Sequence, residues 1–263
     1  MATRTHYDAG TPCWIDLSTP DVDAAKEFYS SLFGWSSEDV FDDDGVRIYT
    51  NFTRDGKVLA GMAQHQPEMD GMPAMWNTYV ATEDVAATAA AVAGAGGQVM
   101  LPPMEVMTEG SMAVFADPTG AVVSVWQAAD HIGAQIVNEP GAWSWNELMT
   151  RDLDAARAFY DAVFGWQTDA MDMGDMGTYH VVRGGKEGIA GMMAMPDDMP
   201  AQVPNHWGIY ILVDDAQAVV TRVTELGGTV AFGPESSAVG VLATLHDPQG
   251  GSFSVMQAPT EDG

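Results

Sequence analysis

The chain is poor in cysteine, in basic residues and in long apolar runs, and each shortage excludes a class of protein. Its 263 residues contain a single cysteine, Cys13, so no disulfide can form within the chain. Ten basic residues stand against 37 acidic ones, a formal net charge of −27, which repels nucleic acid and anionic lipid surfaces. No apolar run approaches the roughly 20 residues of a membrane-spanning helix. The sequence therefore predicts a globular protein without a nucleic-acid or membrane partner.

The first residues also lack the apolar core of a secretory signal, since they read MATRTHYDAGTPCW. Together with the lone thiol, this predicts a cytoplasmic location. The excess of acidic residues has two interpretations, a solubilising outer surface or attraction for a cationic ligand.

Familiar catalytic motifs are missing as well. The sequence has no glycine-rich phosphate loop, no G-x-S-x-G elbow and no Cys/His nucleophile pair. Gly94-Ala95-Gly96-Gly97 follows an expected helix instead of opening one, so it is interpreted as a helix stop.

What the chain does contain is an internal repeat. The segment DVDAAKEFYSSLFGW, from Asp21 to Trp35, returns as DLDAARAFYDAVFGW from Asp152 to Trp166, 131 positions later. Asp-Pro-x-Gly at 117–120 returns at 247–250. Self-similarity at a fixed period indicates a duplicated unit, so we predict two domains, 1–130 and 131–263, that meet within residues 129–141.

Each half reads as a strand, an amphipathic helix and further strands, twice over. Apolar residues at three- and four-residue spacing predict helices at 22–33 and 153–164, each preceded by a capping aspartate. Alanine-rich or amphipathic stretches predict two more helices. Four modules of the form βαβββ result, and they make an α+β fold. The remaining expected elements are strands at 13–17, 46–52, 57–63, 76–81, 112–116, 122–127, 143–149, 207–213, 241–245 and 252–257, and helices at 84–93 and 216–226.

These motifs carry a resemblance. A strand, the capped helix ending in Phe-Gly-Trp, then Gly-Gly-x-Val and Asp-Pro-x-Gly resemble the vicinal oxygen chelate (VOC) superfamily over about 10–258. That superfamily includes glyoxalase I, bleomycin-resistance proteins, fosfomycin-resistance enzymes and extradiol dioxygenases. The chain is also similar to two-domain, glyoxalase-like actinomycete proteins that are often labelled hydroxylases. The resemblance implies tandem VOC domains whose paired modules form two open cup-shaped sheets, each with a small-molecule site inside.

The resemblance also implies where a metal would be held. Metal-dependent relatives carry His, Gln or Glu on the first strand of each module and a carboxylate on the last, as zinc, iron or manganese requires. Here no half keeps a complete ligand set, so we expect no cofactor and disfavour a divalent metal. One group of residues still allows a metal site, namely His206 with His180 and His246 nearby. The corresponding ligand positions hold Trp14, Gly61, Asn77, Ser124, Trp145, Gly191, Gly208 and Ser254.

Strand alternation predicts which residues line the cups. If Trp14 and Trp145 face inward, their strand neighbours two positions away face inward too, and an apolar cup raises the pKa of a carboxyl. Glu147 is the leading catalytic candidate and His206 the second. Two structural alternatives remain open: Asp16 orients the following turn, or Glu147 meets Arg151 or a backbone amide. The candidate ligand-binding residues are Trp14, Asp16, Asn77, Tyr79, Trp126, Trp143, Trp145, His180 and Tyr210.

Three functions follow. The first is a metal-independent protein that binds an aromatic or polycyclic small molecule in a resistance, accessory or biosynthetic role in secondary metabolism. The second is an isomerase- or hydroxylase-like enzyme of the same fold that transfers protons through Glu147 and His206. The third is a metal-dependent lyase or dioxygenase. Four modules in one chain also favour a monomer with an internal pseudo-twofold axis, or a homodimer.

Overall fold

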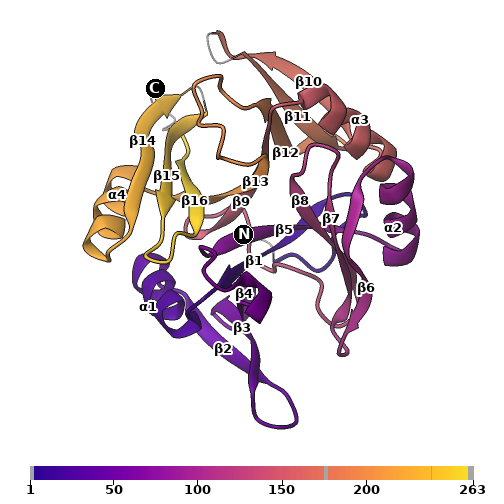
Figure 1. Cartoon of the computed structure of the whole chain (residues 1–263). Helices are drawn as coiled ribbons and strands as arrows, with labels where there is room; N and C mark the ends of the chain where they lie inside the picture. Colours follow the sequence, from indigo (N-terminus) through magenta and orange to yellow (C-terminus); the bar gives the residue numbers. More distant parts are fainter. Residues whose placement is uncertain (1–2, 175–176, 238, 260–263) are drawn as a thin grey trace.

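The computed structural model describes residues 3–174, 177–237 and 239–259, and these form two eight-stranded sheets (Figure 1). No helix in these ranges is long and apolar enough to cross a membrane. The first half contains β1 (Pro12–Thr19), α1 (Val22–Phe33), β2 (Ser36–Phe41), β3 (Arg47–Arg54), β4 (Lys57–Gln64), the 3-10 helix η1 (Pro67–Met69), β5 (Met75–Ala81), α2 (Val85–Gly94), β6 (Gln98–Val106), β7 (Gly110–Ala116) and β8 (Val122–Ala128). The second half contains β9 (Ala142–Thr150), α3 (Leu153–Phe164), β10 (Gln167–Asp172), β11 (Thr178–Gly184), β12 (Glu187–Ala194), β13 (His206–Val213), α4 (Ala216–Glu225), β14 (Thr229–Ser237), β15 (Gly240–His246) and β16 (Ser252–Gln257).

Both sheets have the same topology. The strand order is β2-β3-β4-β1-β5-β8-β7-β6 in the first and β10-β11-β12-β9-β13-β16-β15-β14 in the second. Within each module the last strand runs parallel to the first, and the first strands of two modules meet antiparallel at the centre of the sheet. The predicted α+β fold of four βαβββ modules in two open sheets is therefore confirmed.

The repeated helices form where the sequence places them, because both ends are encoded locally. The Asp21 carboxylate accepts a hydrogen bond from the Ala24 N–H at 3.0 Å, and Gly34 ends α1 in the left-handed conformation at φ 71°. Asp152 and Gly165 do the same for α3. The predicted ranges 22–33 and 153–164 match the observed helices.

The outer strands were not predicted. β2, β6, β10 and β14 lie at the sheet edges, and most of their side chains are exposed on both faces. A strand without a buried face shows no apolar alternation, which is the signal that sequence reasoning uses. Two prolines within β6 weaken the signal further, although an edge strand tolerates them.

The two domains pack through the sides of their sheets that face away from the cups. The Asn146 side chain on β9 donates to Thr78 Oγ1 on β5 at 2.7 Å, and both residues are buried. The Trp35 indole donates to the Gly141 carbonyl at 2.7 Å, and the Trp166 indole donates to the Gly10 carbonyl at 2.6 Å. These reciprocal contacts relate the halves by a pseudo-twofold axis, with α1 beside α4 and α2 beside α3 (Figure 1).

Candidate functional site

A buried carboxylate with two tyrosines forms the floor of the first cup. Asp16 Oδ2 accepts hydrogen bonds from the Tyr49 and Tyr79 hydroxyls, each at 2.9 Å, and Oδ1 accepts from Asn77 Nδ2 at 2.8 Å. The Trp14 indole donates to the Tyr49 oxygen at 3.0 Å. These residues meet because Trp14, Asp16, Asn77 and Tyr79 share one face of the adjacent central strands β1 and β5.

The second cup repeats this cluster with a longer carboxylate. Glu147 Oε1 accepts from the Tyr210 hydroxyl at 2.9 Å, and the Trp145 indole donates to the Tyr179 oxygen at 2.8 Å. The Asn77 position is occupied by Gly208, which lies opposite Glu147. Trp145 and Tyr210 are only half-buried, whereas their counterparts Trp14 and Tyr79 are buried, and Tyr179 and Tyr49 are both half-buried. The second cup is therefore the more accessible of the two.

Neither Tyr49 nor Tyr179 was selected from the sequence. Tyr49 lies on β3 and Tyr179 on β11, each two strands away from the strand that carries the carboxylate. Each tyrosine passes over a glycine of the strand between, Gly61 or Gly191, where an added Cβ would overlap the tyrosine hydroxyl. The repeat holds the missing signal, since both tyrosines and both glycines recur 130 positions apart.

Burial decides the proton chemistry of both clusters. Removal from water raises the pKa of Asp16 and of Glu147, and the tyrosine hydrogen bonds oppose that rise. Burial, with the adjacent carboxylate, also raises the pKa of Tyr210 and of Tyr79 well above the usual range. The phenols therefore stay protonated and donate, and the carboxyl is the group that exchanges a proton.

We expect Asp16→Asn to become more stable relative to the parent protein as pH rises. The Asp16 carboxyl has a higher pKa in the folded protein than in the unfolded chain, where it is about 3.9. Its stabilising contribution is therefore complete below pH 3.9 and is lost as the pH rises through the pKa of the folded state. Asparagine keeps an acceptor for the phenols and has no charge to bury. Urea unfolding from about pH 4 to pH 9 measures the difference, and parallel stability curves for the two proteins would contradict the assignment.

The two structural alternatives for the carboxylates do not match the hydrogen bonds of the described residues. The Arg151 guanidinium donates to the Val203 and Pro200 carbonyls at 2.7 and 2.9 Å, and the Glu147 carboxylate accepts no backbone N–H among those residues. Asp16 accepts hydrogen bonds from phenols on β3 and β5 and from an amide on β5, and does not orient its own turn.

None of the three histidines named from the sequence forms a hydrogen bond or ion pair with Glu147 among the described residues. His206 shares a face with Tyr210 at the start of β13 but pairs with Met149, and its Nδ1 lies 2.9 Å from the Pro204 carbonyl oxygen. His180 alternates with Tyr179 on β11, so it faces away from the cup, where its Nδ1 lies 3.4 Å from Thr168 Oγ1. His246 ends β15 beside Thr229. Within the ranges that the structure describes, no three His, Cys, Asp or Glu side chains are grouped to hold a metal.

Trp126 closes the first cup together with a residue that the sequence did not indicate. The Trp126 indole donates to the His131 carbonyl at 2.7 Å, and the His131 ring packs edge-on against Trp14 with centroids 4.5 Å apart. Burial lowers the pKa of His131 to about 4, so its ring is neutral at neutral pH. His131 belongs to the interdomain segment, where no periodicity marks a side chain as buried.

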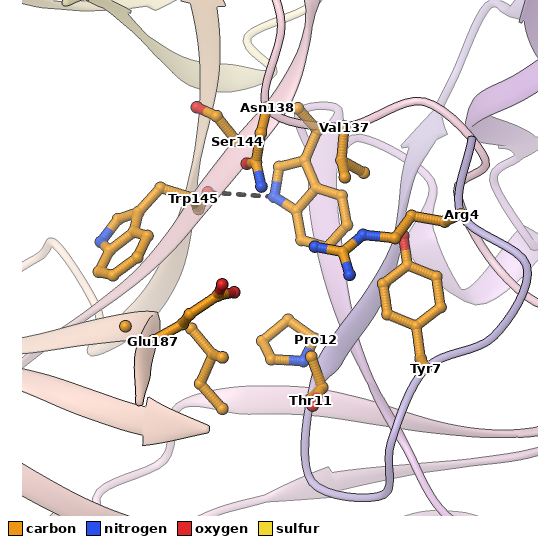
Figure 2. Close-up of a pocket in the computed structure, with 12 residues that line it drawn as sticks. Arg4, Tyr7, Thr11, Pro12, Val137, Asn138, Ser144, Trp145 and Glu187 are labelled. Atoms are coloured by element: carbon orange, nitrogen blue, oxygen red, sulfur yellow. Dashed lines mark hydrogen bonds between the residues drawn. The ribbon is translucent and has the colours of Figure 1, made fainter. Parts of the chain in front are cut away.

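A small cavity of about 70 Å³ opens beside the second cup (Figure 2). Trp143 and Trp145 both line it, and the Trp143 indole donates to the Trp145 carbonyl at 3.1 Å. Arg4 and Tyr7 of the N-terminal segment lie on the side away from Trp145, and Glu187 lies on the Trp145 side. Trp145 thus borders both this cavity and the Glu147 cluster.

Two family profiles match the chain, one in each half. The glyoxalase/bleomycin resistance protein/dioxygenase superfamily matches residues 12–125, and a glyoxalase-like domain matches residues 145–256. "Putative glyoxylase CFP32" of Mycobacterium tuberculosis is 44% identical over 98% of both chains. The chain belongs to this glyoxalase superfamily. The "Anthracycline biosynthesis protein DnrV" of Streptomyces peucetius is 40% identical and spans 96% of this VOC protein and 95% of its own length.

Solved structures of the superfamily share the fold at low identity. A Mn(II)-bound glyoxalase from Novosphingobium aromaticivorans superposes with a TM-score of 0.64 at 19% identity, covering 95% of this chain and 82% of the other. The 2,3-dioxygenase LapB from Pseudomonas sp. KL28 gives a TM-score of 0.65 at 14% identity, with coverages of 98% and 96%. These structural similarities support the two-sheet architecture. They do not identify a reaction, which has to be argued from the residues of the cups.

Proposed function

We propose that this VOC protein binds a planar, oxygenated aromatic small molecule in its second cup, with Glu147 as the hydrogen-bonding and proton-exchanging partner. The observation that carries the proposal is the Glu147–Tyr210 pair, 2.9 Å apart, beside the half-buried indole of Trp145. An indole offers a stacking surface for an aromatic ring. A buried carboxyl with a raised pKa accepts or donates a hydrogen bond to a phenol or a carbonyl.

The names of two relatives support an aromatic ligand. DnrV and "Anthracycline biosynthesis protein DauV" of Streptomyces sp. strain C5 are 40% and 39% identical to this chain over nearly its whole length. Anthracyclines are fused-ring aromatic compounds that carry hydroxyl and carbonyl oxygens. A similar ligand class fits a cup that presents a tryptophan, a carboxyl and two phenols.

We further propose that binding needs no metal ion. The cup floor offers one carboxylate, and the two phenols next to it keep their protons because their pKa values are raised. Neutral phenols are poor ligands for zinc, iron or manganese, which are held by His, Cys or carboxylate groups. The Ser254 position, where relatives carry a carboxylate, supplies only a hydroxyl.

A titration with a soluble hydroxyanthraquinone, followed by tryptophan fluorescence, tests the proposal. We expect saturable quenching at one ligand per chain, and Glu147→Gln to weaken binding by about ten-fold, the equivalent of one charged hydrogen bond. The matched control is Asp16→Asn in the first cup, which should leave the affinity unchanged. Absence of quenching, or equal losses in both variants, would contradict ligand binding in the second cup.

The same titration after dialysis against a chelator tests the metal. We expect an unchanged dissociation constant, because no step of the proposed recognition uses a metal ligand. Loss of binding that Mn²⁺ or Zn²⁺ restores would instead place a metal in the site.

A catalytic role is the second candidate, and the raised pKa of Glu147 favours it. General acid or base catalysis works best when the pKa lies near the working pH. His206 and Glu147 share no hydrogen bond or ion pair among the described residues, so the proposed proton transfer rests on Glu147 with Tyr210.

We also propose that the protein is a monomer, since the two domains already bury their mutual faces. We propose a cytoplasmic location, since Cys13 is a buried free thiol.

A further inference from the structure

A glycine flanks the Glu147 carboxylate on each neighbouring strand of the second sheet. Gly191 on β12 and Gly208 on β13 both pair with Glu147 in register. The Tyr179 side chain covers Gly191, because a Cβ added there would overlap the tyrosine hydroxyl. At Gly208, among the described residues and apart from its chain neighbours, an added Cβ would meet only the Glu147 carbonyl oxygen, at 3.8 Å. The cup floor is therefore covered on one side of Glu147 and open on the other.

The first cup has a side chain in the place that Gly208 leaves open. Asn77 stands 131 positions before Gly208 and pairs with the carboxylate residue of its own cup, Asp16. The Asn77 amide donates to Asp16 Oδ1 at 2.8 Å, and it is one of three side chains that donate to this carboxylate. The second cup keeps a carboxylate, Glu147, and its bond from Tyr210. It has no counterpart of the amide donor, because glycine has no side chain.

The backbone does not require glycine at position 208. Gly208 lies within β13, and its φ is outside the left-handed region that only glycine adopts readily. It is half-buried, as is Tyr210 two positions further along the same face of the strand. What the glycine provides is therefore space beside the carboxylate, and that space can be reached from the cup.

The charge of the cup floor determines which ligand group suits this space. Burial raises the pKa of Glu147, and hydrogen bonds from Tyr179 and Tyr210 oppose that rise because they stabilise the ionised form. An ionised carboxylate only accepts hydrogen bonds. A ligand carbonyl or ether in the open place would set one acceptor against another, whereas an O–H group would supply the missing donor.

We propose that the open place beside Gly208 receives a hydroxyl on the edge of the aromatic ligand, which donates to the Glu147 carboxylate as the Asn77 amide does in the first cup. The inference rests on the proposed function for the aromatic ligand, and it specifies the group that this ligand carries. A ring whose hydroxyl is methylated is therefore a poor ligand of the second cup.

The first test compares a soluble hydroxyanthraquinone with its methyl ether in the fluorescence titration. We expect the parent protein to bind the hydroxyl compound about ten-fold more tightly, since the ether cannot donate. Gly208→Asn fills the place with an amide, so it should weaken binding of the hydroxyl compound by about ten-fold and remove the preference. Asn77→Ala, the control in the first cup, should keep the preference. Equal affinities of the parent protein for the two compounds would overturn the inference while leaving the proposed function intact.

The second test needs no ligand. Gly208→Ala adds only a methyl group in the open place, and Gly208→Asn adds an amide that reaches toward Glu147, so comparing the two variants isolates the hydrogen bond. We expect Gly208→Asn to melt about 3 °C above Gly208→Ala. An equal or lower melting temperature would overturn the open donor place. If the difference is found but neither anthraquinone binds the parent protein, the proposed aromatic ligand is refuted and the donor place beside Glu147 stands, so the two failures are distinguishable.

Discussion

Asp247→Ala is expected to lower the free energy of unfolding by about 5 kcal/mol, because it removes three hydrogen bonds to a charged group, and each is worth about 1.5–3 kcal/mol. Asp247 Oδ1 accepts from the backbone N–H groups of Gln249 and Gly251, at 2.9 and 2.8 Å, and holds the turn between β15 and β16. Its Oδ2 accepts from the Tyr29 hydroxyl of the other domain at 2.9 Å. The substitution thus disrupts a turn and a buried interdomain contact together, and urea unfolding measures the loss.

The repeat supplies a matched control for the interdomain part. Asp117 caps the equivalent turn through Oδ1, which accepts from the Thr119 and Ala121 N–H groups and from the Thr119 hydroxyl, and its buried Oδ2 faces Tyr160, the counterpart of Tyr29. Asp117→Ala should therefore cost about as much as Asp247→Ala. Tyr29→Phe, which removes only the hydroxyl that links the domains, should by itself lower the free energy of unfolding by about 1–2 kcal/mol. An unchanged free energy of unfolding in Tyr29→Phe would show that this hydroxyl contributes nothing.

Gly191→Ala should both destabilise the second domain and impair its cup. The added Cβ would overlap the Tyr179 hydroxyl, and overpacking of this kind costs about 1–3 kcal/mol. Displacing Tyr179 also breaks its hydrogen bond with Trp145, so we expect hydroxyanthraquinone binding to fall by about ten-fold or more. Thermal unfolding and the fluorescence titration report the two effects separately.

Two further variants distinguish a steric overlap with the cup tyrosine from a general loss of stability. Gly61→Ala creates the same overlap with Tyr49 in the first cup, and should cost similar stability while leaving the ligand affinity unchanged. Adding Tyr179→Phe to Gly191→Ala removes the hydroxyl but leaves the ring carbons Cζ and Cε1 overlapping the added Cβ, with Cε1 at 2.9 Å, so it should restore only a small part of the stability. Full restoration would show that the hydroxyl alone is displaced by the methyl group.

Local signals in the sequence predicted most of the framework. The capped helices at 22–33 and 153–164 are encoded by an aspartate, an apolar stripe and a terminal glycine within one short segment, so no distant residue is needed to define them. The edge strands β2 and β6 depend on pairing with a neighbour rather than on a buried face, and sequence reasoning did not find them.

The candidate site divides in the same way. Alternation along a strand predicted that Asp16, Asn77 and Tyr79 share a face, and the structure brings them into hydrogen-bond contact. It also predicted an inward Glu147, which meets Tyr210. The same rule cannot say which strand lies next to which, so Tyr49 and Tyr179 were missed and His180 was selected although it faces away from the cup.

The sequence by itself determined the duplication, the superfamily, the four helices and the carboxylate of each cup, because a repeat is found by comparing the chain with itself, and caps and strand alternation are properties of neighbouring residues. Only the tertiary structure decided which tyrosines reach those carboxylates and that the His131 ring packs against Trp14. Those contacts join residues that are far apart in the chain, and no local pattern in the sequence carries information about such pairs.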